Sequence, residues 1–320
     1  MQKAFIIFGG SGFVGSHLFS LLKNNDPDSR IIVADLVKPA FPAEFILTDV
    51  RKPIQWTLPE ATDALIYNLA AIHKTPGHPD AEYFETNIRG AENVCAFARA
   101  NDINRIVFTS SIAPYGTSEK KKSEDTLPMP NTPYGISKLV AEKIHLAWAA
   151  ENATRVLGIV RPGIVFGKGE GGNFTRLYKA IRKGMFAYAG RKDTRKANIY
   201  VKDLVNVMNL MSQAAPGTRD LLNCCYPQAQ TIEEIAKAVK KVTGIKHHIF
   251  LIPASLLNAA AFVLKSFDKL NLGIHPDRIK KLMISTNIDG SKLSKKYSLQ
   301  FTLEQAIFDW YEDCDRKGLG

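Results

Sequence analysis

The sequence has few cysteines, and none of them forms a recognisable pair. Its four cysteines, in 320 residues, contain no CxxC motif and no disulfide framework. Cys224 and Cys225 lie in an apolar run that we expect to form a buried strand, where thiols act as small apolar side chains. The pattern excludes a disulfide scaffold and predicts a reducing, cytoplasmic location.

Long apolar runs are also missing. The run Ala4 to Phe8 is too short for the core of a signal peptide. The most apolar later stretch, Ile249 to Leu264, is interrupted by Pro253 and Asn258 and falls short of a bilayer span. We expect a packed helix after a proline turn there, and no integral membrane segment. The sequence has no internal repeat, no low-complexity linker and no metal-ligand spacing.

The charge is unbalanced, with 42 basic and 31 acidic residues and a formal net charge of +11. Such a balance suits a phosphate-bearing partner, meaning nucleic acid, an anionic membrane surface or an anionic metabolite, although scattered lysines also keep a protein soluble. The densest basic run, Lys120 to Lys122, is expected to be a solvated loop. Because no zinc-finger or RNP-like pattern accompanies the charge, nucleic acid is not an expected partner.

The first half of the chain alternates strand-like and helix-like segments. Apolar runs without polar alternation are typical of parallel strands covered by helices on both faces. The expected strands are Ala4–Phe8, Ile31–Ala34, Phe45–Leu47, Ala64–Leu69, Arg105–Thr109 and Val156–Val160. The expected helices are Val14–Lys23, Tyr83–Ala100 and Pro133–Ala150.

The second half is less regular. After Arg161 the glycine-rich loop GKGEGG leads into a helix that ends near Lys183, followed by a strand at 199–201 and a helix at 202–211. We therefore predict an α/β protein: a Rossmann domain with a doubly wound parallel sheet, followed by a smaller C-terminal α/β substrate domain. The expected limits are 1–165 for the first domain, with 197–212 returning to it, and 166–320 for the second.

A glycine-rich turn, GGSGFVG, follows the first strand and opens the first helix. Gly9 permits a tight turn, Gly12 lets backbone N–H groups approach a pyrophosphate at the helix N-terminus, and Gly15 lets the helix pack on the strand. Twenty residues after Gly15, Asp35 ends the second strand, where a carboxylate accepts hydrogen bonds from the ribose of NAD and repels the 2′-phosphate of NADP. The spacing predicts an NAD site.

Tyr134 and Lys138 form a Tyr-x-x-x-Lys pair on one face of a predicted helix. A protonated lysine beside a phenol lowers the pKa of the phenol, as a general base for an alcohol requires. Ser111, in the loop after the fifth strand, is placed to share a substrate oxygen with Tyr134.

These motifs together resemble the extended short-chain dehydrogenase/reductases, particularly the NAD-dependent nucleotide-sugar epimerases and dehydratases. The matching segments occur in family order over about the first two-thirds of the chain. They are GGSGFVG, Asp35, TDV at 48–50, NLAA at 68–71, TNIRG, TSSIAPYG, YGISK, RPGIVFG at 161–167 and YVKDLV at 200–205. The late segment NIDGSKLSKKYSLQFTLEQAI also looks like the family's C-terminal ending.

The resemblance implies a role for each matching position. Tyr134 is implied to be the base, Ser111 its proton-relaying partner, and Lys138 a contact of the nicotinamide ribose. The implied NAD-binding residues are Gly9, Gly12, Phe13, Val14, Gly15, Asp35, Asp49, Val50, Leu69, Ala70, Ala71 and Asn87, together with Tyr134 and Lys138. The implied substrate-binding residues are His73, Ser111, Asn173, Arg195, Lys196 and Arg278.

The sequence departs from the family pattern in three places. The Arg-Pro-x-Asn segment has Ile164 as its fourth residue, which removes a polar contact to a diphosphate. Pro114 replaces a usual β-branched residue before Tyr115. Ile112 and Ala113 stand where dehydratases tend to have an acidic pair, which argues against dehydration.

The leading hypothesis is therefore an NAD-dependent nucleotide-sugar epimerase that inverts C4 through a 4-keto intermediate. Its expected partner is a nucleotide-diphosphate sugar, and family members often dimerise through two helices, here Tyr83–Ala100 and Pro133–Ala150. A second hypothesis is a one-way oxidoreductase, either a nucleotide-sugar 4-keto reductase or a hydroxysteroid/sterol-type dehydrogenase, which Ile164 and the apolar segment Ile252–Val263 favour. A third is a non-catalytic protein that senses NAD or scaffolds partners.

Overall fold

The computed structural model describes residues 2–58, 62–73, 77–257 and 283–320. It divides into two compact units. Unit 1 comprises residues 1–116, 124–162 and 201–224, and unit 2 comprises 117–123, 163–200 and 225–320.

Unit 1 is built on a seven-stranded parallel sheet with the order β12-β7-β5-β4-β1-β2-β3. Its strands are β1 (Gln2–Phe8), β2 (Arg30–Asp35), β3 (Glu44–Leu47), β4 (Thr62–Asn68), β5 (Arg105–Thr109), β7 (Val156–Pro162) and β12 (Arg219–Cys224). The strand order reverses between β1 and β4, and in doubly wound sheets a ligand binds where the order reverses, beyond the carboxyl ends of the strands. The predicted Rossmann fold is confirmed.

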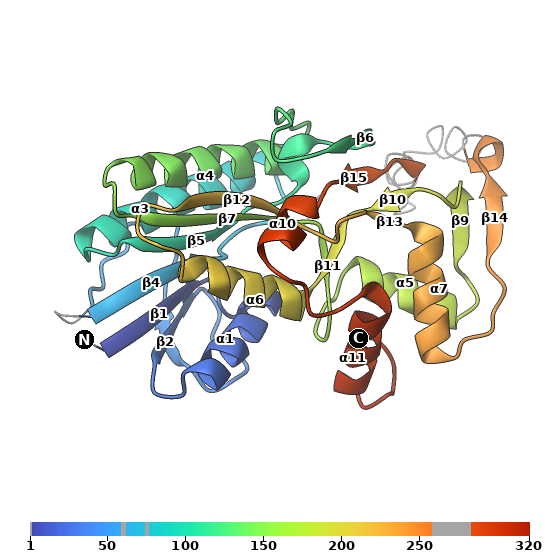
Figure 1. Cartoon of the computed structure of the whole chain (residues 1–320), viewed down its shortest axis with the longest axis horizontal. Coiled ribbons are helices and arrows are strands. Elements are labelled where there is room, and N and C mark those ends of the chain that lie inside the picture. The colour runs from blue at the N-terminus through green and yellow to red at the C-terminus, as the bar shows by residue number, and fades with distance from the viewer. Residues whose placement is uncertain (1, 59–61, 74–76, 258–282) are drawn as a thin grey trace. The chain divides into compact units, whose positions relative to one another are not determined.

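Helices cover both faces of this sheet (Figure 1). Helices α3 (Gly90–Ala100) and α4 (Pro133–Ala150) lie on one face, and α1 (Phe13–Asn25) and α6 (Val201–Ser212) lie on the other. The core between the sheet and α3 and α4 includes Phe8, Phe97, Phe108 and Trp148. Because both faces are covered, the central strands carry apolar runs without polar alternation, as in Ala4–Phe8 of β1 and Ala64–Tyr67 of β4.

The predicted helix Tyr83–Ala100 is broken into three parts. It begins as α2 (Asp80–Phe84), continues as the π-helical turn η1 (Glu85–Arg89), and ends as α3. A π turn holds one more residue than an α turn and changes the direction of the side chains within it. A further short helix, η2 (Ala113–Tyr115), follows β5.

Unit 2 is smaller and contains shorter strands. A four-stranded sheet has the order β13-β10-β15-β6, and two further pairs are β11-β8 and β14-β9. The strands are β6 (Ser118–Lys122), β8 (Ile164–Phe166), β9 (Ala187–Gly190), β10 (Arg195–Lys196), β11 (Asn198–Tyr200), β13 (Gln230–Thr231), β14 (Phe250–Pro253) and β15 (Thr286–Ile288). The helices are α5 (Asn173–Arg182), α7 (Ile232–Thr243), α10 (Ser291–Lys296) and α11 (Leu303–Asp313).

Two local expectations are wrong. Lys120 to Lys122 is not a loop but part of β6, the edge strand of the four-stranded sheet, which pairs with β15 much later in the chain. The apolar stretch at 249–264 begins with the exposed strand β14, which pairs with β9, in place of a proline turn. Residues 254–257, directly after Pro253, are helical as expected. Residues 258–264 lie outside the described part of the chain.

Candidate active site

The glycine turn joins β1 to α1 at the carboxyl end of the sheet. Gly9 has a φ of +73°, and a Cβ atom there would lie 2.6 Å from the backbone nitrogen of Ala70, in the segment after β4. A Cβ on Gly15 would lie 2.3 Å from the carbonyl oxygen of Gly10. Both glycines are therefore required by the packing of the protein itself.

Gly12 differs from the other two. A Cβ there would meet only the oxygen of Gly9, at 3.5 Å, so the surrounding protein leaves room for a side chain. Gly12 is the N-cap of α1, and no side chain caps this end of the helix. The first backbone N–H groups of a helix have no partner within it, and here the residues that carry them begin with Phe13 and Val14. This open, uncapped helix end fits the pyrophosphate of a dinucleotide.

Asp35 lies at the end of β2 and faces the same turn. Its carboxylate accepts hydrogen bonds from the backbone N–H of Ser11 at 3.0 Å and of Leu36 at 2.6 Å. These bonds fix the carboxylate next to the glycine turn, where it would accept hydrogen bonds from the adenosine ribose of NAD. The residues present therefore fit NAD, and the protein holds the acidic group in place with its own backbone.

Two further residues expected near the adenine lie after β3. The carboxylate of Asp49 is paired with Arg51, whose Nε and Nη2 each lie 2.8 Å from it, and the pKa of Asp49 is lowered mainly by this hydrogen bond. Val50 is buried against Gly90, and its carbonyl oxygen accepts a hydrogen bond from Asn93. Asp49 thus carries a local ion pair, and Val50 joins this loop to α3.

The segment after β4 carries Leu69, Ala70 and Ala71, each half-buried beside the glycine turn. Asn87, in the π turn η1, fixes Ile72, the residue that follows this segment. Its Oδ1 accepts a hydrogen bond from the N–H of Ile72 at 3.0 Å, and its Nδ2 donates one to the Ile72 carbonyl at 3.2 Å. Nδ2 also donates to Oγ of Ser137 at 2.8 Å. Asn87 therefore joins the segment after β4 to helix α4.

Helix α4 carries Tyr134 and Lys138. The helix begins at Pro133, and Oγ1 of the N-cap residue Thr132 accepts a hydrogen bond from the N–H of Gly135. The hydroxyl of Ser137 donates to the carbonyl of Tyr134 at 2.9 Å. Tyr134 thus lies in a well-fixed first turn, and the chain of bonds from Asn87 reaches it.

Tyr134 and Ser111 come together, although they belong to different elements. A side-chain hydrogen bond joins them and lowers the pKa of Tyr134, but burial has the larger effect and raises it. Oγ of Ser111 also accepts a hydrogen bond from the N–H of Ala113 at 3.1 Å, which orients the hydroxyl. The net shift of the tyrosine pKa is upward, opposite to the direction that the Tyr-x-x-x-Lys spacing predicts, because desolvation outweighs the favourable contacts.

Lys138 is almost fully buried, with 2% of its surface exposed. Burial lowers its pKa from 10.5 to about 7, and the carboxylate of Glu142 opposes the shift. Its Nζ lies 4.5 Å from the ring centre of Phe108, in a cation–π contact. A lysine in this environment titrates near neutral pH, which makes its charge sensitive to what binds beside it.

Beneath these residues lies a buried ion pair that the sequence analysis did not identify. Glu142 accepts two hydrogen bonds from Arg161, at 2.8 and 2.5 Å, and one from the hydroxyl of Ser110 at 2.5 Å. Arg161 also lies over the ring of Tyr115, 4.6 Å from its centre. Glu142 stands four residues after Lys138, on the same face of α4, and this spacing is the signal that could have found it.

A buried histidine completes this region. His145 stacks on Phe108, with ring centres 4.1 Å apart, and its Nε2 lies 3.2 Å from Nδ2 of Asn68. Burial lowers the pKa of His145 to about 4, and Lys138 lowers it further. Phe108 is therefore sandwiched between a neutral imidazole and the amine of Lys138.

The predicted substrate residues are distributed differently. His73 is exposed in unit 1. Asn173, Arg195 and Lys196 all belong to unit 2, and Arg278 lies outside the described residues. Oδ1 of Asn173 accepts a hydrogen bond from Arg176 at 2.9 Å.

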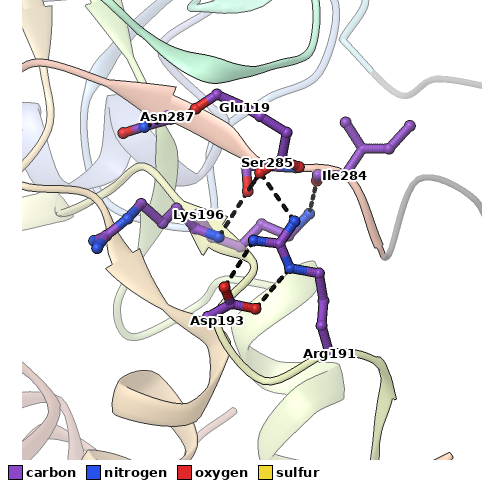
Figure 2. A network of polar contacts seen from close by, with 8 residues as sticks. Glu119, Arg191, Asp193, Lys196, Ile284, Ser285 and Asn287 are labelled. Carbon is purple, nitrogen blue, oxygen red and sulfur yellow. Dashed lines mark hydrogen bonds and ion pairs between the residues drawn. The ribbon is translucent and has the colours of Figure 1, made fainter. Parts of the chain in front are cut away.

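The two cations of β10 are engaged within unit 2. Nη1 of Arg195 donates to the carbonyl of Ala229 at 2.8 Å. Nζ of Lys196 donates to the carbonyl of Ile284 at 2.8 Å, within the polar network of Figure 2. Burial lowers the pKa of Lys196 to about 8, and the carboxylate of Glu119 opposes the shift. Adjacent residues of a strand point to opposite faces, so one flat ligand surface cannot use both side chains equally.

Comparison with known proteins connects this geometry to a family. The sequence profile of the NAD dependent epimerase/dehydratase family matches residues 5–225. The chain belongs to this family. Its members are enzymes, and the glycine turn, Asp35 and the Tyr134–Lys138 helix of this chain all lie within the matched range.

Individual relatives agree with this assignment. The chain is 28% identical to an N-acetyl-alpha-D-glucosaminyl-diphospho-ditrans,octacis-undecaprenol 4-epimerase of Escherichia coli O157:H7, over 96% of this chain and 94% of that protein. It is 26% identical to a 3 beta-hydroxysteroid dehydrogenase/Delta 5-->4-isomerase of Mycobacterium tuberculosis, over 94% of this chain and 88% of that one. The structure of a UDP-glucuronic acid 4-epimerase from Bacillus cereus, in complex with NAD, matches with a TM-score of 0.75 and 20% identity, over 98% and 99% of the two chains.

The described residues offer neither a cluster of metal ligands nor a membrane-spanning helix. Among the residues that the structure describes, no three or more His, Cys, Asp or Glu side chains gather in a way that could hold a metal ion. None of the described helices has the length and apolar character needed to cross a membrane.

Proposed function

We propose that this member of the NAD dependent epimerase/dehydratase family inverts C4 of a sugar that is linked to a diphosphate, through a 4-keto intermediate. The observation that carries the proposal is the Ser111–Tyr134 hydrogen bond beside the buried Lys138, in the same unit as the glycine turn. The likeness to a 4-epimerase over nearly the whole chain supports the choice of reaction.

In this proposal Tyr134 is the general base. Its phenolate takes the proton of the sugar C4 hydroxyl and later returns it, and Ser111 holds the same substrate oxygen by a hydrogen bond. NAD, held at the glycine turn and Asp35, would supply the hydride acceptor and donor for the sugar C4 atom. The pKa of Tyr134 is raised in the protein alone, so the base has to be activated in the complete site, by Lys138 in its charged form.

Glu142 and Arg161 support this arrangement as positioning residues. The carboxylate of Glu142 favours the charged form of Lys138, while Arg161 and Ser110 fix that carboxylate in a single orientation. The negative charge of Glu142, one helical turn from Lys138, thus favours the protonated form of Nζ. On this proposal the pair adjusts the base without touching the substrate.

The part of the substrate that does not react, and that anchors the sugar, is proposed to be a diphosphate. Either Lys196 or the neighbouring Arg195 of β10 would supply a cation for the phosphates. The carrier of the diphosphate is a nucleotide in the leading hypothesis. A polyprenol carrier is a second candidate, because the Escherichia coli relative acts on an undecaprenol-linked sugar and because Ile164 replaces the polar diphosphate contact of the nucleotide-sugar pattern.

The test is a mass balance with purified protein. The expected result is interconversion of a diphosphate-linked sugar and its C4 epimer, with no net change in the absorbance of NADH. Net consumption of one NAD or NADH per turnover would overturn the proposal in favour of a one-way oxidoreductase. A hydroxysteroid dehydrogenase is the version that the Mycobacterium tuberculosis relative favours, so a sterol should be included in the panel.

The homodimer and the cytoplasmic location also remain proposals. Helix α4 exposes Ile136 and Val140, at 40% and 37% of their surfaces, and these apolar side chains support a dimer through α3 and α4. Size-exclusion chromatography with light scattering measures the oligomeric state directly.

A further inference from the structure

A group of exposed apolar side chains lies in unit 2 and includes none of the residues assigned to the active site. Strand β14 is exposed at all four of its positions. Phe250 has 67% of its surface exposed, Leu251 44% and Ile252 38%. Phe250 and Ile252 share one face of the strand, because alternate residues of a strand point to the same side. An exposed apolar patch of this kind marks an interaction site more often than isolated exposed residues do.

The loop between α5 and β9 extends this apolar surface. It carries Met185, whose side chain is 76% exposed. Strands β9 and β14 pair in parallel, with Ala187 opposite Phe250, so the residues before each strand are neighbours. A Cβ atom built on Gly184 would lie 3.5 Å from Nδ1 of His247, which places the two segments in contact.

The two segments that carry these apolar side chains are basic. Residues 182–192 and 235–257 contain eight lysines and arginines and no aspartate or glutamate. In the described part of the chain, the ion pairs of these two segments involve Arg191, Lys192, Lys237 and Lys241. None of those pairs includes Arg182, Lys183 or Lys246, which are exposed.

We call this surface the docking patch. It consists of Arg182, Lys183, Met185, Lys246, Phe250 and Ile252, and it combines exposed apolar groups with positive charge outside those ion pairs. We propose that the docking patch binds the surface of a bilayer that contains anionic phospholipid. Apolar side chains would enter the boundary between head groups and acyl chains, and the cations would lie at the level of the phosphates.

The charge argues for this occupant over a second copy of the chain. Symmetric pairing of two docking patches would bring Arg182, Lys183 and Lys246 of both copies together, and like charges across an interface are unfavourable. A net charge of +11 also favours an anionic surface. The proposal goes beyond the proposed function and does not depend on it, because neither NAD nor a sugar is involved.

The experiment is sedimentation of the full-length protein with vesicles, without NAD or sugar. We expect binding to vesicles of phosphatidylcholine and phosphatidylglycerol in equal parts, weaker binding to phosphatidylcholine alone, and release by salt. The double variant Lys183→Glu/Lys246→Glu should reduce partitioning at least about 25-fold, since each basic residue near an anionic surface contributes about fivefold. Phe250→Ser should reduce it about tenfold.

Matched controls separate the docking patch from general effects. Lys295→Glu removes an exposed lysine of α10, and Leu47→Ser removes an apolar side chain that is 71% exposed in unit 1. Both should bind vesicles within about twofold of the wild type. Thermal melting and an NAD titration of every variant confirm that it is folded, and loss of NAD binding alone would count against the proposed function and not against docking.

Three results would overturn the proposal. One is failure of the wild type to bind the anionic vesicles at low salt. Another is an equal loss of binding in the docking-patch variants and their controls, which would make the attraction a property of the whole surface. The third is that Phe250→Ser leaves vesicle binding unchanged but lowers the melting temperature or dissociates a dimer. Such a result would mean that β14 is covered by protein.

Discussion

Arg161 and Glu142 form a two-point ion pair inside unit 1, with only 4% and 2% of their side chains exposed. A charge buried this deeply is stable only while its partner is present, because neither group can recover the hydration it has lost. The pair joins β7 to α4 directly below Lys138, so it links the stability of the protein to the electrostatics of the proposed base.

Removing one member of this pair should destabilise the protein strongly. We expect Arg161→Met to lower the free energy of unfolding by about 3–5 kcal/mol, since the carboxylate of Glu142 is left buried and unpaired. The double variant Glu142→Gln/Arg161→Met should recover part of that loss. Urea denaturation measures both. The matched control is Glu151→Gln, which weakens the exposed ion pairs with Arg99 and Arg155 and should destabilise the protein far less than Arg161→Met. Additive effects of the two buried substitutions would contradict the coupling.

Tyr134→Phe should abolish most of the activity and leave cofactor binding intact. Loss of a general base lowers the rate about 10²–10⁴-fold, and the remaining ring keeps its contacts with Tyr83 and the surrounding core. The measurements are kcat with the active sugar diphosphate and the Kd for NAD. Full turnover of the variant would show that another group removes the proton.

Two glycines of the turn, Gly12 and Gly15, should respond differently to alanine. Gly12→Ala should leave the melting temperature unchanged and weaken NAD binding, because the new Cβ meets no protein atom closer than 3.5 Å. Gly15→Ala should unfold the protein at a lower temperature, since its Cβ would overlap the backbone of Gly10. If Gly12→Ala bound NAD as tightly as the wild type, the pyrophosphate would not lie at this helix end.

Asp35→Asn should reduce the preference for NAD. The substitution keeps the shape of the side chain but removes the charge that would repel a 2′-phosphate. We expect the ratio of NADP to NAD affinity to rise at least about tenfold, as follows from the loss of charge-assisted hydrogen bonds. Titration with both cofactors decides it. An unchanged ratio would place the specificity elsewhere, with Lys38 the nearest candidate in the sequence.

The depressed pKa of Lys138 predicts a pH-dependent stability. Between about pH 7 and its ordinary value of 10.5, the unfolded chain binds a proton that the folded chain lacks, so stability should rise with pH. One such proton corresponds to about 1.4 kcal/mol per pH unit. In the protein without added NAD, Lys138→Met should reduce the slope by the contribution of this one lysine, whereas Lys196, whose pKa is lowered to about 8, should keep its own contribution. Equal slopes for the two proteins would mean that the buried lysine stays charged.

Much of unit 1 could be predicted because its signals are local. The Tyr134 helix is specified by Thr132 and Pro133, which favour a helix start within a few residues. The glycine turn follows its strand directly. By contrast, β6 forms only because Ser118 and Lys122 pair with a strand that lies far later in the chain, and a run of lysines carries no sign of that partner.

The electrostatics of the site could not be predicted for a similar reason. The spacing of Tyr134 and Lys138 indicated the direction of their mutual influence but not the burial that opposes it. That burial comes from Phe108 on β5 and from the helices packed beside it, so it depends on the assembled fold. The position of Glu142, four residues after Lys138 on α4, could have been singled out from the sequence. Its pairing with Arg161 could not, because Arg161 lies on β7 and the two residues meet only in the folded sheet.

The π turn at Glu85–Arg89 has a consequence for the length of this chain. A regular α-helix could connect residues 80 and 100 if a single residue were deleted from the turn, and the helix itself would gain hydrogen bonds. The deletion would rotate everything on one side of it by about 100°, the angle between successive residues in an α-helix. Asn87 could then no longer bond Ile72 and Ser137 together, so the extra residue is retained at the expense of helix regularity.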